Sequence, residues 1–295
     1  MAIRVEEIRR YFMALQDEIV GAMEALDGEA VFRREELPGP NGGLSRPRVL
    51  EGGRAIEKAA VQYTFSRGDA LPAAATERNP HLAGRAFQAV AISLIVHPGN
   101  PYAPTTHANL RFFLVEADEP VWYFGGGFDL TPFYGFEEDC VHWHTQAKAA
   151  AGEHYPALKK QCDEYFYLPH RQECRGIGGL FFDDWTEGGF ACAFAFVRSV
   201  GDHFLPAYLP ILERRMDTPY AARQRDWQLY RRGRYAEFNL AIDRGTRYGL
   251  QSGRRVESVL ASLPPLVTWR YDYHPEPGSP EAALLTDFLP PRDWV

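Results

Sequence analysis

The sequence predicts an α+β fold: a single domain over residues 1–295, with a large, mostly antiparallel β-sheet flanked by α-helices on both faces. Three observations support this class. The chain begins with an amphipathic helical pattern, its first half contains β-rich runs joined by a short turn, and its second half connects further β-rich runs through long helical segments. Neither an internal repeat nor a linker-like stretch interrupts the chain, which favours one domain.

The first half of the chain combines one long helix with strands. Apolar residues recur at three- and four-residue spacing between Ile3 and Leu26, as in a helix that buries one face. A later β-rich run ends at the turn-forming sequence that begins with His97 and Pro98. The expected elements are a helix over 2–26, short strands at 30–34 and 48–52, a strand at 87–96, and a hairpin of 107–115 with 121–124.

The second half is dominated by helical patterns, with shorter β-rich runs between them. Pro264 and Pro265 end the last helical pattern, since proline cannot continue a helix. The expected elements are helices at 137–151 and 154–167, a strand at 176–182, mostly helical segments at 186–203 and 205–227, a strand at 235–242, a short helix at 256–262 and a last strand at 266–273.

Composition narrows the classes of function. A formal net charge of −7 and a pI near 5.8 argue against general nucleic-acid binding. No apolar run reaches the roughly 18 to 20 residues that span a bilayer, and the acidic N-terminal segment is unlike a secretory or transit peptide, so we expect a cytoplasmic protein. The cysteines lack CxxC or CxxxCxxC spacing, so we expect neither an iron–sulfur cluster nor a zinc ribbon.

Arginine accounts for most of the basic residues. Residues 223–255 hold nine arginines, no lysine and three acids, a local charge of +6. Guanidinium groups bind carboxylates through two parallel hydrogen bonds, so this segment would suit a polycarboxylate ligand. The alternative is that the arginine excess is compositional and the segment a solvated face. For Arg244, Arg254 and Arg255, which flank the glycine-containing loop at 251–253, we favour a functional role.

Four histidines lie near predicted strand or helix ends, where sites usually occur: His97, His107, His144 and His170. Imidazole can bind a divalent metal or exchange protons near neutral pH. A single histidine is more often a hydrogen-bonded structural residue. His107 is the exception, because Asn109 and Arg111 share its strand face at period two, and such a polar face is costly to bury without a polar ligand.

Two aspartates stand at places suited to catalysis. Asp129 follows three glycines, and Asp243 ends a predicted strand. Either carboxylate could accept N–H bonds from a nitrogen heterocycle or act as a base. The alternatives are a turn cap for Asp129 and an ion pair with Arg244 or Arg247 for Asp243.

Two further features are ambiguous. Asp183 and Asp184 could ligate a metal, but we expect Asp184 to cap a helix beginning at Thr186. The aromatic residues at 122–124 and 165–167 could line a flat apolar pocket, although for most of them a core role is favoured.

Several long blocks resemble the oxygen-dependent coproporphyrinogen III oxidase family, and together they cover nearly the whole chain. His97 and Pro98 belong to the first block, and Asp243 to Thr246 form another short one. The longer blocks are NPYAPTTHANLRFF at 100–113, WYFGGGFDLTPFY at 122–134, RGIGGLFFDD at 175–184, RRGRYAEFNL at 231–240 and PPLVTWRYDY at 264–273. Chance matches over such lengths are implausible.

The resemblance implies an activity. The enzyme would use dioxygen to decarboxylate two propionates of coproporphyrinogen III to vinyl groups, giving protoporphyrinogen IX, carbon dioxide and hydrogen peroxide in haem biosynthesis. It implies a homodimer with a flat sheet, in which residues 235–270 contribute to the contact. No organic cofactor is implied, and a divalent metal such as manganese stays open. The oxygen-independent enzyme of the same reaction is excluded by the missing CxxxCxxC motif, while a porphyrin carrier and a histidine-iron oxygenase remain minor rivals.

The resemblance also implies roles for individual residues. His107 matches a proposed proton donor, and His97, His107, His144 and His170 match metal-ligand positions of bacterial relatives. Substrate-binding positions are matched by Ser93, Asn109, Leu110, Arg111, Gly253, Arg254 and Arg255. With a four-carboxylate tetrapyrrole as substrate, Arg111, Arg175 and Arg244 could hold propionates, and Asp129 and Asp243 could accept pyrrole N–H bonds or act as the base.

Overall fold

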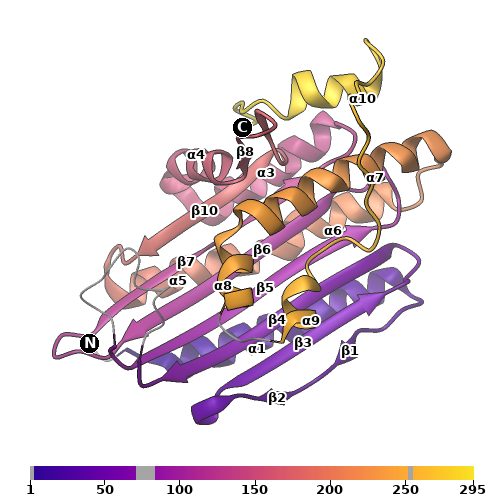
Figure 1. The fold of residues 1–295 in the computed structure, drawn as a ribbon. Coiled ribbons are helices and arrows are strands. Elements are labelled where there is room, and N and C mark those ends of the chain that lie inside the picture. Colours follow the sequence, from indigo (N-terminus) through magenta and orange to yellow (C-terminus); the bar gives the residue numbers. More distant parts are fainter. Residues whose placement is uncertain (1–2, 71–83, 252–254) are drawn as a thin grey trace.

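A long antiparallel sheet runs through the molecule (Figure 1). The computed structural model describes residues 3–70, 84–251 and 255–295, so Gly253 and Arg254 lie outside the described residues. Within these, the strand order is β1-β3-β4-β5-β6-β7-β10, with β2 paired to β3 and every pair antiparallel. The strands of this sheet are β1 Arg33–Arg34, β2 Leu37–Pro38, β3 Leu44–Glu51, β4 Ile56–Gly68, β5 Phe87–Pro98, β6 Thr105–Val115, β7 Val121–Thr131 and β10 Gly178–Trp185.

Helices cover both faces of the sheet (Figure 1). Behind it in this view are α1 Val5–Asp27, α3 Glu137–Ala151, α5 Gly189–Asp202 and α6 Phe204–Arg215. In front are α7 Ala222–Glu237, α8 Arg244–Gln251 and α9 Val256–Leu260. The remaining elements are α4 Tyr155–Tyr165, which packs along β10, the hairpin β8 Tyr167–Leu168 with β9 Glu173–Cys174, the short helix α10 Pro280–Ala283, the 3₁₀ turns Pro40–Gly42 and Gly152–His154, and the π-helical turns Phe238–Ile242 and Leu284–Phe288.

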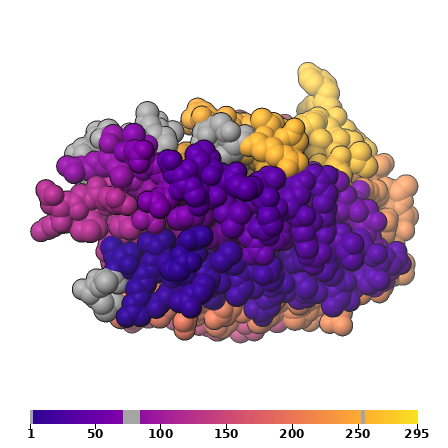
Figure 2. All heavy atoms as spheres, turned by 90° about the horizontal axis from the view of Figure 1, so that it is seen from below, coloured from indigo at the N-terminus to yellow at the C-terminus, as the bar shows by residue number. Residues whose placement is uncertain are grey.

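The main core lies between the sheet and the helices behind it. In α1, Ile8, Phe12, Leu15 and Ile19 recur at helical spacing and are buried against apolar strand residues. Each such side chain contributes about 1.5 to 3 kcal/mol when fully buried. Gly28 ends α1 in the left-handed conformation (φ 75°), which glycine adopts without steric cost. Figure 2 shows the layers edge-on, with indigo α1 on one side of the strands and the orange-to-yellow C-terminal segments on the other.

The fold class and most predicted elements are confirmed. The structure has the large antiparallel sheet and helices on both faces, and the predicted hairpin is formed by β6 and β7. The sequence patterns did not reveal β4, the longest strand described (Ile56–Gly68). Among the described residues, no helix has the length and apolar character needed to cross a membrane.

Two predicted strands are wrong. Residues 235–242 form the last turn of α7 and a π-helical turn, because Tyr235 and Phe238, three positions apart, both turn into the core while Leu240 is exposed. Residues 266–273 form no strand in this structure; they lie against α7, where Thr268 N donates to Leu229 O.

Helix boundaries in the second half also differ from expectation. The predicted helical segment 205–227 is divided between α6 and α7, with 216–221 outside any helix. Asp184 does not cap the next helix: it lies in β10 with φ 51°, and α5 begins only after Gly188.

Candidate active site

Polar side chains gather on the sheet face that turns away from the main core. The register pairs Ser93 of β5 with Asn109 of β6, and Asn109 with Gly127 of β7. Because side chains alternate along a strand, His107 and Arg111 point to the same face as Asn109. We call this surface, with Gln62, Ser93, His107, Asn109 and Arg111, the polar face. It is covered by α8 and α9, and Gln62 Nε2 donates to Ser258 O of α9.

One predicted substrate residue lies elsewhere. The side chain of Leu110 points away from the polar face and is buried in the main core, between the sheet and the helices behind it. The alternation of β6 requires this, since Asn109 and Arg111 face the opposite way. The structure therefore does not bring the Leu110 side chain to the other predicted residues.

A buried ion pair adjoins the polar face, on the same side of the sheet as His107. Asp129 of β7 is 2% exposed; its Oδ1 accepts from His107 Nδ1 at 2.8 Å, and its Oδ2 accepts from Arg175 Nη2 at 2.7 Å. Burial acts to raise the pKa of Asp129, but the charge of Arg175 and the hydrogen bond from His107 outweigh it, so the pKa is lowered. Asp129 is therefore an ionised carboxylate that orients the His107 ring, rather than the cap of a turn.

Aromatic rings enclose the other member of this pair. The Arg175 guanidinium carbon lies 4.2 Å from the ring centroid of Phe166, 4.5 Å from that of Tyr235 and 4.6 Å from that of Phe238. Arg175 Nη1 donates to Asn239 Oδ1 at 3.2 Å. The enclosed Arg175 guanidinium fixes the Asp129 carboxylate and contributes to the electrostatic potential of the site. It is too deeply buried to contact a ligand on the polar face.

Asp243 is positioned differently from Asp129. Its Oδ1 accepts from the Tyr165 hydroxyl at 2.9 Å, and its Oδ2 accepts from the backbone N–H and the hydroxyl of Thr246 at 2.7 and 2.8 Å. Burial opposes ionisation, but these hydrogen bonds from Thr246 lower the pKa of Asp243. The contacts to Thr246 are those of a cap at the start of α8. Asp243 contacts neither Arg244 nor Arg247 through a described ion pair.

The carboxylate of Asp183 links the sheet to helix α8, which covers it. Asp183 of β10 accepts from Arg111 Nη2 at 2.7 Å and from Arg244 Nη2 of α8 at 3.1 Å. Arg111 also donates to Asn109 Oδ1 at 2.8 Å. The Arg111 guanidinium lies flat over Gly125 of β7, where a Cβ would come within 2.6 Å of Nη2. The sequence prediction underrated Asp183, although Phe181 and Asp183 share one strand face at period two.

The four predicted metal-ligand histidines do not converge. His97 Nε2 donates to Ser262 O and its Nδ1 lies 3.1 Å from the Thr105 hydroxyl, while His144 contacts Ile177 O and the Tyr155 hydroxyl. His170 donates to a glutamate of α7. Across residues 3–70, 84–251 and 255–295, no three His, Cys, Asp or Glu side chains are grouped so that they could hold a metal ion. The predicted four-histidine metal site does not fit this structure.

Burial explains why two of these histidines are unsuited to proton exchange as well. Burial lowers the pKa of His144 to about 3 and brings the pKa of His97 well below its usual value. Both rings therefore stay neutral near pH 7 and act as structural hydrogen-bonding groups. Only the position of His107, on the half-buried polar face, suits chemistry on a ligand.

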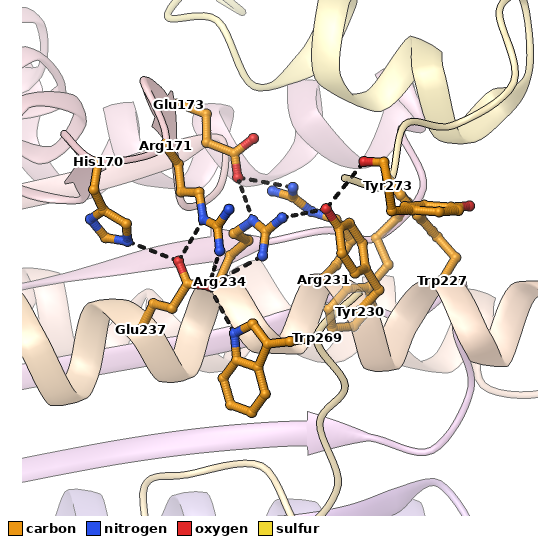
Figure 3. Close-up of polar contacts among 11 residues, drawn as sticks. His170, Arg171, Glu173, Trp227, Tyr230, Arg231, Arg234, Glu237, Trp269 and Tyr273 are labelled. Carbon is orange, nitrogen blue, oxygen red and sulfur yellow. Dashed lines mark hydrogen bonds and ion pairs between the residues drawn. The ribbon is translucent and has the colours of Figure 1, made fainter. Parts of the chain in front are cut away.

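Most arginines of the segment 223–255 are structural. Arg231 and Arg234 of α7 pair with Glu173 of the β8–β9 hairpin at 2.9 and 3.3 Å (Figure 3). Arg225 and Arg232 pair with Glu57 at 2.6 and 2.8 Å. Arg255 pairs with Glu35, toward the β1 edge of the sheet. Arg244 pairs with Asp183, which also binds Arg111 of the polar face.

Comparison with known protein families agrees with the motifs. The family model described as coproporphyrinogen III oxidase matches residues 7–294. The match includes every residue of the polar face and the helices that cover it.

Proposed function

Since the chain belongs to the coproporphyrinogen III oxidase family, we propose that it catalyses the oxygen-dependent decarboxylation of two propionates of coproporphyrinogen III, in the cytoplasm and as a step of haem biosynthesis. Each propionate would lose carbon dioxide and two electrons. Dioxygen would accept the electrons and, with one proton from the propionate chain and one from solvent, become hydrogen peroxide. The products are then a vinyl group, carbon dioxide and peroxide, and two rounds give protoporphyrinogen IX.

The observation that carries this proposal is the composition of the polar face. A flexible tetrapyrrole with four carboxylates needs cations for its propionates and a wide surface for its ring. Arg111 and Arg244 supply accessible guanidinium groups from two different elements. Gly125 of β7, which has no side chain, lets the Arg111 guanidinium lie close over the strand.

His107 and Asp129 form the proton-exchanging pair in this proposal. Asp129 binds Nδ1 of the ring, so Nε2 is the nitrogen that would face a ligand. The buried Asp129 would act through His107 by keeping the ring oriented. His107 would then exchange a proton with a pyrrole nitrogen or with the propionate β-carbon. Asp243 would keep α8 in place above the site through its contacts to Tyr165 and Thr246.

We also propose that the enzyme is a homodimer. Large apolar side chains are exposed on the segments after α7, including Leu240, Val256, Leu266, Trp269 and the fully exposed Tyr271. A second copy of the chain would cover this surface, since exposed apolar clusters mark interaction sites. Sedimentation of the wild-type protein should give twice the monomer mass, and Leu266→Asp with Tyr271→Asp should give the monomer.

The experiment that tests the reaction is aerobic turnover of coproporphyrinogen III by chelator-treated protein, with protoporphyrin followed by fluorescence after oxidation. We expect product with added chelator, none without dioxygen, and one peroxide for each carbon dioxide. A His107→Gln variant should lose at least about 100-fold in kcat, the usual contribution of a general acid or base. His170→Gln, which changes a histidine outside the polar face, is the matched control.

Two outcomes would contradict the proposal. Tight binding of porphyrin without turnover under any condition would identify a carrier. Turnover that depends on a stoichiometric divalent ion would contradict the arrangement of the histidines, since the described residues offer no ligand set for one.

A further inference from the structure

Asp183 is a carboxylate placed between the two accessible arginines of the proposed substrate site. Its side chain is 15% exposed, whereas the side chains of Arg111 and Arg244 are 25% and 49% exposed. Arg111 comes from the sheet and Arg244 from the covering helix α8. The pair is thus joined across the site by one acid that is less accessible than either of its partners.

Strand alternation in β10 puts Asp183 on the same face as Phe181, which pairs with Gly127 beside Asn109, and an irregularity follows in the strand. The pairing of β10 with β7 shifts register between Phe182 and Trp185, as in a β-bulge, which re-aims side chains at the end of a strand. Asp184 adopts φ 51° at this bulge, a left-handed conformation that aspartate and asparagine tolerate better than other non-glycine residues. The local sequence therefore directs Asp183 onto the polar face.

Stacked rings fix the surroundings of the two arginines. Phe181 and Tyr165 stack with centroids 4.2 Å apart and an interplanar angle of 11°. The Arg111 guanidinium lies 5.9 Å from the Phe181 centroid, and that of Arg244 lies 4.9 Å from the Tyr165 centroid. Arg111 also donates to Asn109 Oδ1, and its guanidinium lies over Gly125. Both guanidinium groups therefore have supports besides Asp183.

We propose that Asp183 is a resident carboxylate: it pairs with Arg111 and Arg244 when their subsite is empty, and a substrate propionate replaces it there. This inference rests on the proposed function and identifies a specificity-determining residue within it. Two guanidinium groups and one carboxylate carry a net charge of +1, which one propionate neutralises. When the propionate departs, Asp183 pairs with both arginines again, so two neighbouring cations are never left unpaired.

The proposal predicts that removing a charged side chain from the site strengthens ligand binding. Asp183→Asn keeps the shape of the side chain but removes the competing charge, so the subsite becomes +2. Coproporphyrin III, a stable oxidised analogue, should bind about tenfold more tightly, as expected for removal of one like charge at a few ångströms. Binding should also become more salt-dependent. In turnover, KM should fall while kcat falls as well, because product is released more slowly.

The measurement is fluorescence titration of coproporphyrin III against wild type, Asp183→Asn and Asp184→Asn. Asp184→Asn is the matched control, because it removes the same charge from the next residue and asparagine tolerates the same backbone conformation. It should leave the affinity within about twofold, since an exposed neighbouring charge is screened. If Asp183→Asn does not fold, Arg244→Gln gives the test in reverse, because its neutral subsite should bind at least about tenfold less tightly.

The outcomes separate this inference from the proposed function. Unchanged or weaker binding by Asp183→Asn, with wild-type turnover intact, would overturn the resident-carboxylate role and leave Asp183 as a scaffold for the arginines. A wild-type protein that neither binds coproporphyrin III nor converts coproporphyrinogen III would overturn the proposed function itself.

Discussion

Two groups of arginines in this molecule use the same chemistry for different purposes. On the polar face, Arg111 and Arg244 share Asp183 and keep part of their surface accessible. In the cluster of Figure 3, Glu237 accepts from both Arg171 Nε and Nη2, from His170 and from Trp269, while Glu173 accepts from Arg231. We call this second group the α7 cluster.

Accessibility separates Arg111 and Arg244 from Arg231 and Arg234 of the α7 cluster, whereas charge does not. Arg231 and Arg234 are only 3% and 6% exposed, so no ligand can reach them. The α7 cluster instead joins α7, the β8–β9 hairpin and the segment that carries Trp269. A positively charged stretch of sequence therefore does not by itself identify an anion site. What identifies one is a guanidinium group that is fixed by protein contacts and still open to a ligand.

The largest expected effect comes from removing one arginine of each group. Arg111→Ala should lower kcat/KM about 100-fold by removing a charge-assisted contact to substrate, and it should leave the free energy of unfolding nearly unchanged. Arg231→Ala should do the reverse. It should lower the free energy of unfolding by about 3 kcal/mol, because the buried Arg231 side chain and its ion pair with the half-buried Glu173 are both lost, and it should leave kcat/KM of the folded enzyme unchanged.

Steady-state kinetics and urea denaturation of the same two preparations test this division. If Arg231→Ala lost activity as severely as Arg111→Ala while remaining folded, the α7 cluster would be part of the site and the distinction would fail.

The second prediction concerns Glu237 alone. Burial opposes its ionisation, but hydrogen bonds from Arg171, His170 and Trp269 lower its pKa to about 2. A carboxylate whose pKa is lowered on folding stabilises the protein above its unfolded value of about 4.5, and this stabilisation is lost as the pH falls toward 2. Glu237→Gln should lower the free energy of unfolding at pH 7 by about 2 kcal/mol, allowing for solvent screening of a partly exposed group.

Denaturation at pH 7 and at pH 4 measures this contribution. The difference between wild type and Glu237→Gln should shrink at the lower pH. A difference that is constant over this range would mean that Glu237 acts through packing and not through its charge. The conservative control is Glu164→Gln, which changes an exposed glutamate of α4.

The sequence predicts those features of the molecule that depend on local periodicity. Helix α1 and the hairpin of β6 and β7 follow from repeats of about four and two residues, and the shared face of His107, Asn109 and Arg111 follows from strand geometry alone. The motifs in turn predict the family.

Features that depend on distant partners are not accessible to this reasoning. The pattern at 235–242 suits a short strand or a helix end, and the choice is made by Tyr235 and Phe238 packing around Arg175. The four histidines lie in separate environments, and four arginines of α7 pair with Glu57, Glu173 and Glu237. Most of these contacts join residues that are remote in sequence. Spacing within one segment contains no information about such contacts.

The third prediction sharpens the claim that Arg111 must be both fixed and accessible. At Gly125, a Cβ would collide with Arg111 Nη2, Nε and Cζ at 2.6, 2.7 and 2.8 Å. The colliding atoms are the far end of a flexible side chain, so Gly125→Ala should fold normally while displacing the guanidinium. We expect KM to rise about tenfold with little change in kcat, which corresponds to a loss of roughly 1.4 kcal/mol of binding free energy.

Gly99→Ala is the control, since a Cβ there meets only Arg54 O at 4.0 Å. Equal KM values for the two variants would show that the position of Arg111 does not matter.

The last prediction extends the same division to the histidines. His144 donates to Ile177 O and accepts from the Tyr155 hydroxyl, and burial lowers its pKa to about 3. The unfolded chain binds this proton near pH 6.5 and the folded chain does not, so the folded state is penalised as the pH falls below 6.5. Wild type should therefore lose about 1.4 kcal/mol of stability for each pH unit between 6.5 and 4.5 from this residue.

His144→Gln keeps a hydrogen-bonding side chain without the titration, so its stability should be lower at pH 7.5 but fall less steeply with acid. Thermal melts between pH 7.5 and 5 compare the slopes, and parallel slopes would mean that His144 is already protonated in the folded protein. The same substitution at His107, on the polar face, should change kcat instead. The histidines therefore differ in the same way as the arginines. His144 is a buried structural residue, whereas His107 is an accessible residue that can act on a ligand.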